Sequence, residues 1–474
     1  MKRFRFAFLF LFILTISLCA LAAEKTPPLP KDLPPYGPTV PFHAPRVEVK
    51  KLANGLTLWL VSRPGFPKVA FALAVRGGMA SDPAERPGLS EFLMATLDQG
   101  TKTRSAKQIA EEIQAAGGDL SGEARADVVL VATDVLASKA EAALALLADV
   151  FENATFPDSE VALARRNAAD SLRAQEADPG FLASRALAKE VFGSHPYSVV
   201  SPTQDSISRT QPEELRKQYV RRFRPDHGIL VAVGDFNEAT LAAAVEKLFS
   251  KWQPPKEAPV PAIAEPAHEN PHAVFVVERP ESVQTTFAIA CFGPLERHPD
   301  FAATQVANAV YGGMFGSRLV KNIREDKGYT YSPRAFLQSR REAGILQTRA
   351  DVRNPVTGAT LNEIEYELNR MATTAPTEDE VTQARRYLVG LQAIRLQSQQ
   401  SVARQLATLW SYGLPSEELG LESERIQKVT AQDVEAAGKK YFPASRQTIV
   451  AVGEEKVIKE ELAPLGLPVR TASQ

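Results

Sequence analysis

The chain has 474 residues, of which 44% are apolar and 23% charged. This composition excludes collagen, a coiled-coil rod and wholesale disorder, and the length allows two or three domains. The 55 basic and 56 acidic residues nearly cancel, so the charge balance gives no sign of a nucleic-acid partner.

Residues 1–22 have the pattern of a secretory signal peptide. Lys2, Arg3 and Arg5 precede an apolar run from Phe8 to Leu18, and Ala20-Leu21-Ala22 matches a small-x-small cleavage site. No other run reaches the roughly 18 apolar residues of a membrane span. We therefore expect an exported protein with no membrane segment after cleavage, located in the periplasm if the host has two membranes.

The two cysteines do not predict a disulfide in the mature protein. Cys19 would be removed with the signal, and Leu18 stands where a lipid-attachment site requires a small residue, so lipidation is disfavoured but open. Cys291 alternates with Phe287 and Ile289, which predicts a buried strand position.

Two proline-rich stretches divide the chain. Residues 23–45 are expected to form an extended arm with little core of its own. Residues 251–273 interrupt the middle of the chain and are typical of a linker between two halves.

The two halves repeat the same landmarks at a nearly constant offset. Arg63-Pro64, Phe71 and Gly77 recur 216 positions later as Arg279-Pro280, Phe287 and Gly293. The run that ends at Gly234 recurs 219 positions later in the run that ends at Gly453. Such spacing predicts two copies of one unit of about 200 residues.

Each copy is predicted to be an α+β unit. In the first, Val69, Phe71, Leu73 and Val75 alternate with alanines as in a buried strand, and a helix is expected from Pro87 to Gly100. Strands mixed with runs of helices predict a mainly antiparallel sheet packed against helices in each half. The expected domains are residues 46–250 and 274–468, followed by a tail at 469–474.

The string His268-Glu269-Asn270-Pro271-His272 has the letters of a zinc-protease motif but not its structure. That chemistry needs both imidazoles on one helix face, and a proline inside a helix costs about 3 kcal/mol. We interpret the string as linker. The remaining histidines have no partner at ligand spacing and are expected to be structural or solvated: His43, His195, His227 and His298.

A different segment resembles a known enzyme family. The stretch from Gly88 to Thr101, with Arg104-Ser105 and Gly117-Gly118-Asp119 after it, is similar to the N-terminal domain of the pitrilysin-type metalloproteases, the inverted zincins. Active members of that family have H-x-x-E-H on this helix, with two histidines as zinc ligands and the glutamate as general base.

The resemblance implies a degenerate metal site. Glu91, Met94 and Ala95 occupy the three motif positions, and the family's third ligand, a glutamate, matches Ser171, with Asp170 as its neighbour. These residues cannot supply the three protein ligands of a catalytic zinc. We therefore expect no metal in this chain.

The second half keeps what the resemblance assigns to it. Residues 311–332 are the most specific match, and relatives present an arginine and, seven residues later, a tyrosine to the zinc site of the other half. Arg324 and Tyr331 have that spacing, and Tyr329 is a weaker alternative. The nearby glycines are expected to let a substrate strand approach: Gly312, Gly313 and Gly316. The residues alone leave open a plain ion pair at Arg324 and a core position for Tyr331.

The resemblance to short two-domain members, such as the mitochondrial processing peptidase subunits, suggests a division of labour. The leading hypothesis is a subunit without zinc in an exported heterodimeric metallopeptidase, inactive alone, whose homologous partner holds the zinc and whose substrates are peptides or unfolded small proteins. The alternative is an inert scaffold or peptide-binding subunit resembling respiratory-complex core proteins. A third possibility, an independent zinc protease using the linker string, is tested by metal content of the chain alone.

Overall fold

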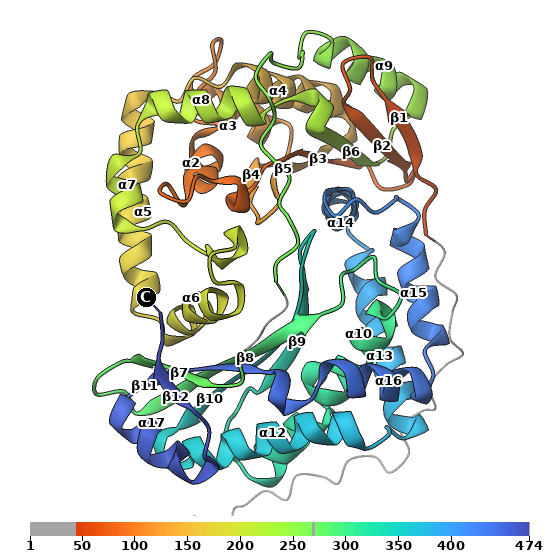
Figure 1. Ribbon diagram of the computed structural model, residues 1–474. Helices are drawn as coiled ribbons and strands as arrows, with labels where there is room; N and C mark the ends of the chain where they lie inside the picture. Colours follow the sequence, from red (N-terminus) through yellow and green to blue (C-terminus); the bar gives the residue numbers. More distant parts are fainter. Residues whose placement is uncertain (1–43, 268–270, 474) are drawn as a thin grey trace, which may run out of the picture. The chain divides into compact units, whose positions relative to one another are not determined.

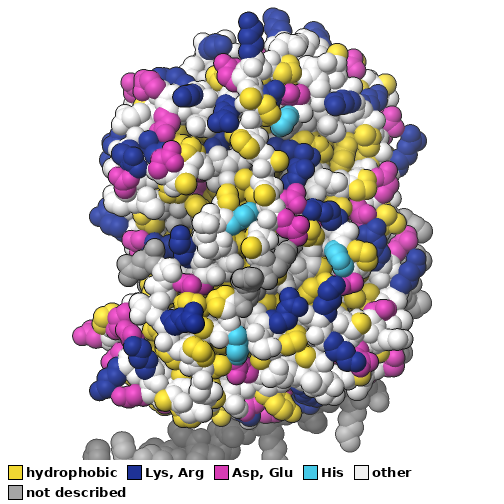
Figure 2. Space-filling view, in the orientation of Figure 1, with side chains coloured by type: hydrophobic (Ala, Val, Ile, Leu, Met, Phe, Trp, Pro, Cys, Tyr) yellow, Lys and Arg dark blue, Asp and Glu magenta, His cyan; other side chains and the backbone are white. Residues whose placement is uncertain are grey.

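The computed structural model describes residues 44–267 and 271–473, so the signal peptide, nearly all of the proline-rich arm and the first three residues of the linker string lie outside it. Among the described residues, no helix has the length and apolar character that crossing a membrane requires. On the face that Figure 2 shows, basic and acidic side chains are interspersed, in keeping with the near-neutral charge balance.

The first half contains one six-stranded sheet, in the order β1-β2-β6-β3-β5-β4. Only β2 and β6 run parallel; the other neighbours are antiparallel. The strands are β1 (Glu48–Lys51), β2 (Thr57–Ser62), β3 (Lys68–Arg76), β4 (Ser121–Ala124), β5 (Val128–Leu136) and β6 (Gly228–Gly234). The helices are α2 (Leu89–Thr96), α3 (Ala106–Ala115), α4 (Ala140–Asn153), α5 (Asp158–Glu176), α6 (Pro179–Phe192), α7 (Gln204–Arg209), α8 (Pro212–Arg222) and α9 (Glu238–Phe249).

The second half repeats this sheet, in the order β12-β7-β11-β8-β10-β9. Its strands are β7 (Val274–Glu278), β8 (Gln284–Gly293), β9 (Arg334–Ser339), β10 (Gly344–Arg353), β11 (Thr448–Gly453) and β12 (Val469–Thr471). The helices are α10 (Phe301–Asn308), α11 (Arg318–Val320), α12 (Thr357–Thr373), α13 (Glu378–Arg395), α14 (Gln399–Ser411), α15 (Glu418–Lys428), α16 (Ala431–Tyr441) and α17 (Glu455–Leu462), with π-helical segments η5 (Ala309–Gly313) and η6 (Lys321–Asp326).

The matching strand orders confirm two homologous α+β units with mainly antiparallel sheets. The region expected to be a tail differs, because residues 469–471 form β12, which pairs in parallel with β7 and extends the second sheet. Its backbone groups gain partners there that an exposed tail would leave to water.

The two halves exchange a helix. In the first sheet, Phe71 and its large neighbours face the helices of their own half, whereas Ala70, Ala72 and Ala74 face α14 from the second half. Ala288 and Ala290 of β8 likewise face α6 from the first half. Figure 1 shows α6 on the second sheet and α14 beside the first. The alanines let each foreign helix pack closely, so both faces of both sheets are buried.

Polar contacts join the halves at the same places. Arg125 donates to the Thr408 hydroxyl over 2.7 Å, and the backbone N–H of Arg341 donates to Asp127 Oδ2 over 2.9 Å. Within the first half, Tyr197 Oη donates to the other carboxylate oxygen of Asp127 over 2.6 Å.

Candidate functional site

The helix with the degenerate zinc motif begins two residues later than expected. Its N-cap is Gly88 at φ 92°, and a Cβ there would lie 2.4 Å from the Cβ of Pro202, so only glycine fits. The free N–H groups of the first turn are bound by Asp82, which accepts from Gly88 N and Ser90 N at 3.1 Å each. The carboxylate replaces the capping side chain that glycine lacks.

Asp82 is itself held by a buried arginine from α8. Arg222 Nη1 lies 2.9 Å from Asp82 Oδ1, with exposed side-chain fractions of 0% and 1%. Arg222 also donates to the carbonyls of Gly77 and Ser81 at 3.1 Å each. This network fixes the start of α2 against the strand before it.

Three of the four degenerate motif positions line one cavity between α2 and α5. Glu91, Ala95 and Ser171 border this space of about 400 Å³. Met94 instead packs against β4, where a Cβ on Gly122 would lie 3.0 Å from its Cε. Asp170 is exposed and pairs with Arg173 on α5, outside the lining.

The cavity lies at the positions that match the family's zinc ligands, but the side chains at these positions are not a zinc ligand set. Burial and the nearby Asp82 carboxylate raise the pKa of Glu91 to about 7. One carboxyl that is half protonated at neutral pH, beside an alanine and a serine, does not fit a catalytic zinc. No group of three or more His, Cys, Asp or Glu side chains in residues 44–267 and 271–473 is arranged to hold a metal.

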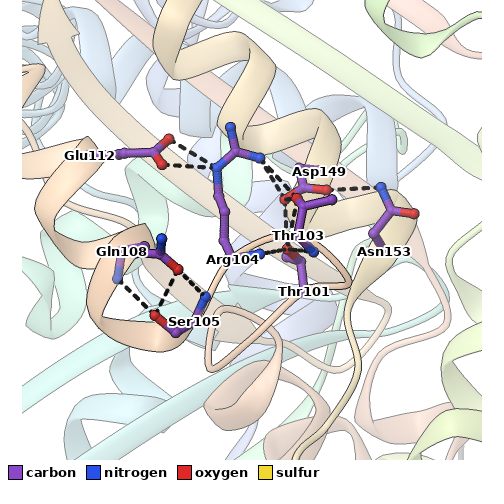
Figure 3. A network of polar contacts seen from close by, with 8 residues as sticks. All are labelled: Thr101, Thr103, Arg104, Ser105, Gln108, Glu112, Asp149 and Asn153. Carbon is purple, nitrogen blue, oxygen red and sulfur yellow. Dashed lines mark hydrogen bonds and ion pairs between the residues drawn. The ribbon is translucent and has the colours of Figure 1, made fainter.

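The loop after α2 is tied down by a polar network (Figure 3). Arg104 bridges Glu112 of α3, at 2.9 Å, and Asp149 of α4, at 2.8 Å. Against the effect of its partial burial, hydrogen bonds from Thr101, Arg104 and other neighbours lower the pKa of Asp149 below its usual value. The Thr101 and Arg104 of the resembling segment therefore serve to anchor this loop.

In the second half, Arg324 contacts two aromatic rings. Its guanidinium carbon is 4.5 Å from the ring centroid of Phe315 and 4.7 Å from that of Tyr331. Both rings are exposed, Phe315 by 66% and Tyr331 by 81%, so Tyr331 is not a core residue. Arg324 Nε also lies 3.3 Å from Glu325, which is the ion pair that the residues had left open. Tyr329 donates its backbone N–H to Ile323 O at 2.9 Å.

The three glycines of this region have different reasons to be glycine. A Cβ on Gly312 would lie 2.9 Å from Ala335 Cβ, and one on Gly313 would lie 2.8 Å from the Asn308 amide nitrogen. Packing therefore explains both. Gly316 has open space around it, and the approach of a substrate strand stays a prediction there.

Three of the described histidines make ring hydrogen bonds: His195, His272 and His298, whose Nδ1 accepts from Asp300 N at 3.0 Å. His195 Nε2 lies 2.9 Å from Ala264 O while its Nδ1 accepts from Tyr197 N. His272, the one histidine of the linker string within the described residues, has its Nδ1 3.1 Å from Gln447 O. Cys291 is fully buried, as predicted, and burial raises the pKa of its thiol to about 11.

Sequence reasoning missed Phe315 and the α5 face of the cavity. That face follows a helical spacing that the sequence does contain: Glu160, Leu163, Ala164, Asn167, Ala168 and Ser171. The spacing alone does not say which helix it faces. For Phe315, no pattern links a side chain in a glycine-rich turn to an arginine nine positions on.

Comparison with known proteins supports the family resemblance. A family model described as "Insulinase (Peptidase family M16)" matches residues 58–199, and one described as "Peptidase M16 inactive domain" matches residues 209–388. An uncharacterized zinc protease of Rickettsia bellii is 25% identical over 85% of this chain and 96% of its own length. The uncharacterized zinc protease YmxG of Bacillus subtilis is 26% identical over 62% of this chain and 70% of its own length.

Solved structures agree. The crystal structure of a peptidase M16 inactive domain from Pseudomonas fluorescens has a TM-score of 0.81 and 25% identity, covering 90% of this chain and all of that one. A protease from Helicobacter pylori shares the fold, with a TM-score of 0.82 at 16% identity, over 87% of this chain and 100% of its own. Sequence, fold and the position of the degenerate motif helix together place this chain in the pitrilysin-type peptidase M16 family.

Proposed function

We propose that this protein is the subunit without zinc of an exported heterodimeric M16 metallopeptidase, and that it supplies Arg324 and Tyr331 to the active site of its partner. The observation behind this proposal is the exposed stack of Phe315, Arg324 and Tyr331. Exposing two aromatic rings around a guanidinium has no benefit for the core of this chain. It makes sense if a second molecule covers them.

The two side chains suit peptide hydrolysis. The attack on a peptide bond places negative charge on the former carbonyl oxygen, which hydrogen-bond donors can stabilise. A preorganised donor contributes roughly 2–4 kcal/mol to such a transition state. The two ring contacts hold the guanidinium in place, and its Nη groups, which the Nε ion pair with Glu325 does not use, can donate N–H bonds. The phenol O–H of Tyr331 offers a second kind of donor.

The proposal assigns the metal to the partner. A homologous M16 subunit with an intact H-x-x-E-H would hold the zinc and its bound water, and this chain would contribute no ligand. Both proteins would work in the periplasm on peptides or unfolded small proteins. An extended substrate can add to a sheet edge, and β4 and β9 are edge strands of the described sheets.

Co-purification from the native host, followed by zinc analysis of the complex and of this chain alone, tests the division of labour. We expect zinc in the complex and none in the separated chain. Arg324→Ala and Tyr331→Phe should each lower turnover of the reconstituted complex by roughly one to three orders of magnitude, with assembly unchanged. Arg353→Ala, an exposed arginine at the end of β10, is the matched control.

Two outcomes would contradict the proposal. If both variants assemble and turn over normally, the chain is a scaffold or a peptide-binding subunit, and Arg324 makes only its ion pair with Glu325. If the chain alone binds stoichiometric zinc and loses peptidase activity on His268→Ala, it is an independent protease.

A further inference from the structure

A second, larger cavity lies where α6 meets the second sheet. It measures about 750 Å³ and is bordered by the first residues of α6 and by the ends of β8, β9 and β10. Its lining includes three arginines and several neutral donors: Arg279, Arg334, Arg349, Ser184, Ser332 and Thr286. Because Ser332 follows Tyr331 directly in the chain, the cavity adjoins the Arg324 stack.

Two of the arginines lie opposite each other in the sheet, and neither forms an ion pair within the described residues. Arg349 of β10 is the direct cross-strand partner of Arg334 of β9, an arrangement that like charges destabilise. No carboxylate of the described residues lies within ion-pair distance of either guanidinium. Burial and the charge of Arg334 lower the pKa of Arg349, although the nearby charges of Asp351 and Asp178 partly oppose this shift.

The hydrogen bonds of Arg349 leave donors unused. Its Nη2 donates to the Ser184 hydroxyl over 2.6 Å, and its buried Nε has no acceptor. A buried N–H without a partner is costly, and a guanidinium offers five donors in a planar fork. The protein thus presents more donors here than its own acceptors satisfy.

The acidic residues of the lining do not fill this need. Asp351 accepts from the Thr286 hydroxyl at 2.6 Å, and Asp178 accepts from Gly180 N at 2.8 Å as the N-cap of α6. Asp178, Glu281 and Asp351 are exposed, as is Arg334, whereas Arg279 and Arg349 are half-buried. The negative charges of the three acidic residues disfavour a multiply charged anion such as phosphate. A planar monoanion can still pass between these acids to reach the guanidinium fork of an arginine.

We propose that this cavity binds a carboxylate of the peptide substrate, held by Arg334 and Arg349 together. One carboxylate between the two guanidiniums would cancel their repulsion and give Arg349 Nε an acceptor. Phe181 and exposed Val283 supply apolar surface for the residues next to that carboxylate. That the ligand is a peptide rests on the proposed function; the carboxylate chemistry rests on the cavity itself.

The carboxylate can come from the C-terminus of the peptide or from an aspartate or glutamate side chain. Fluorescence anisotropy with the purified full chain alone separates these sources. A short unstructured labelled peptide is compared with its C-terminal amide and with a version whose acidic side chains are changed to amides. We expect one of the two changes to weaken binding by roughly tenfold to a hundredfold.

Arg334→Gln and Arg349→Gln should each weaken peptide binding by the same roughly tenfold to hundredfold. Arg349→Lys keeps the positive charge but not the planar guanidinium, so it should weaken binding by an intermediate amount. Arg353→Gln on the same strand, outside the cavity, should bind like the unchanged chain. Thermal melts identify any variant that fails to fold, and the peptide series on the unchanged chain does not depend on those variants.

Equal binding of all peptide versions would overturn the proposal, and so would displacement of the peptide by inorganic phosphate at lower concentration than by acetate. Because no partner or turnover is needed, this result is independent of whether Arg324→Ala affects catalysis.

Discussion

The guanidinium carbon of Arg324 lies 4.7 Å from the ring centroid of Tyr331, so the two side chains expected to act in a partner's site already contact each other in this chain. The guanidinium also contacts Phe315, whose ring centroid is 4.5 Å away. The arginine is therefore held by two rings before any partner binds. A donor that is oriented in advance loses little entropy when it meets the substrate.

Phe315→Ala should loosen Arg324 without removing it. An exposed cation–π contact contributes about 0.5–1 kcal/mol, so turnover of the reconstituted complex should fall by roughly twofold to fivefold, less than with Arg324→Ala. Phe315→Tyr should keep turnover at the level of the unchanged complex, because a phenol ring makes the same contact with the guanidinium. Tyr366→Ala, which removes a 56% exposed ring on α12, is the control. Unchanged turnover in Phe315→Ala would show that the stack does not position Arg324.

Restoring the ligands should restore a zinc site. Glu91→His and Ala95→His place two imidazoles one turn apart on α2, and Ser171→Glu adds a carboxylate from α5 across the same cavity. The triple variant should bind about one zinc per chain by atomic absorption. The double variant without Ser171→Glu should bind it far more weakly. A folded triple variant without zinc would mean that these positions do not correspond to the ligand positions of the family.

Glu91 should make the protein less stable as the pH rises. Its pKa of about 7 lies above the value of 4.5 for an unperturbed glutamate, so between these values the folded state binds more protons than the unfolded state. Stability from this group is thus lost as pH rises from about 4.5 to about 7. At pH 8, Glu91→Gln should raise the free energy of unfolding by up to about 3 kcal/mol, which urea unfolding detects as a higher midpoint. At pH 4 the substitution should have little effect on stability.

Other carboxyls change with pH as well, so the informative quantity is the difference between the variant and the unchanged chain. Glu111→Gln, at an exposed position on α3, is the matched control. An equal effect of Glu91→Gln at both pH values would contradict the raised pKa.

The buried pair of Arg222 and Asp82 should be critical for stability. Removing one member leaves the other charged and buried, which typically costs 3–5 kcal/mol, so Arg222→Met and Asp82→Asn should each lower the free energy of unfolding by about that amount. The double variant should lose less than the sum of the two. In the exposed pair of Arg173 and Asp170, single changes should cost less than about 1 kcal/mol. Urea unfolding measures all of these, and additive losses would rule out a coupled pair.

Much of the fold could be predicted from local patterns. The offset between Gly77 and Gly293 reflects equivalent strand ends in β3 and β8, and the alternation around Phe71 and around Cys291 gave buried strands. The predicted start of α2 was two residues too early, because the backbone at Gly88 is constrained by Pro202, which is distant in sequence.

The sequence predicted which residues belong to the candidate site, but it did not predict which of them lie close together in space. Matching Glu91, Ala95 and Ser171 to a ligand pattern requires only sequence, whereas their shared cavity depends on how α2 packs on α5. The same holds for Arg334 and Arg349, whose opposition is a matter of strand register. Register and helix packing are set by many distant side chains at once, so no local pattern reveals them.

By itself, the order of residues determined the duplicated architecture and the loss of metal ligands, since both depend on residue identity at fixed spacing. Only the tertiary structure decided that α6 and α14 are exchanged between the halves and that Phe315 and Tyr331 both contact Arg324. The physical reason is that a small alanine surface or an aromatic ring can accept many partners. Which partner it receives is settled by the packing of the whole chain.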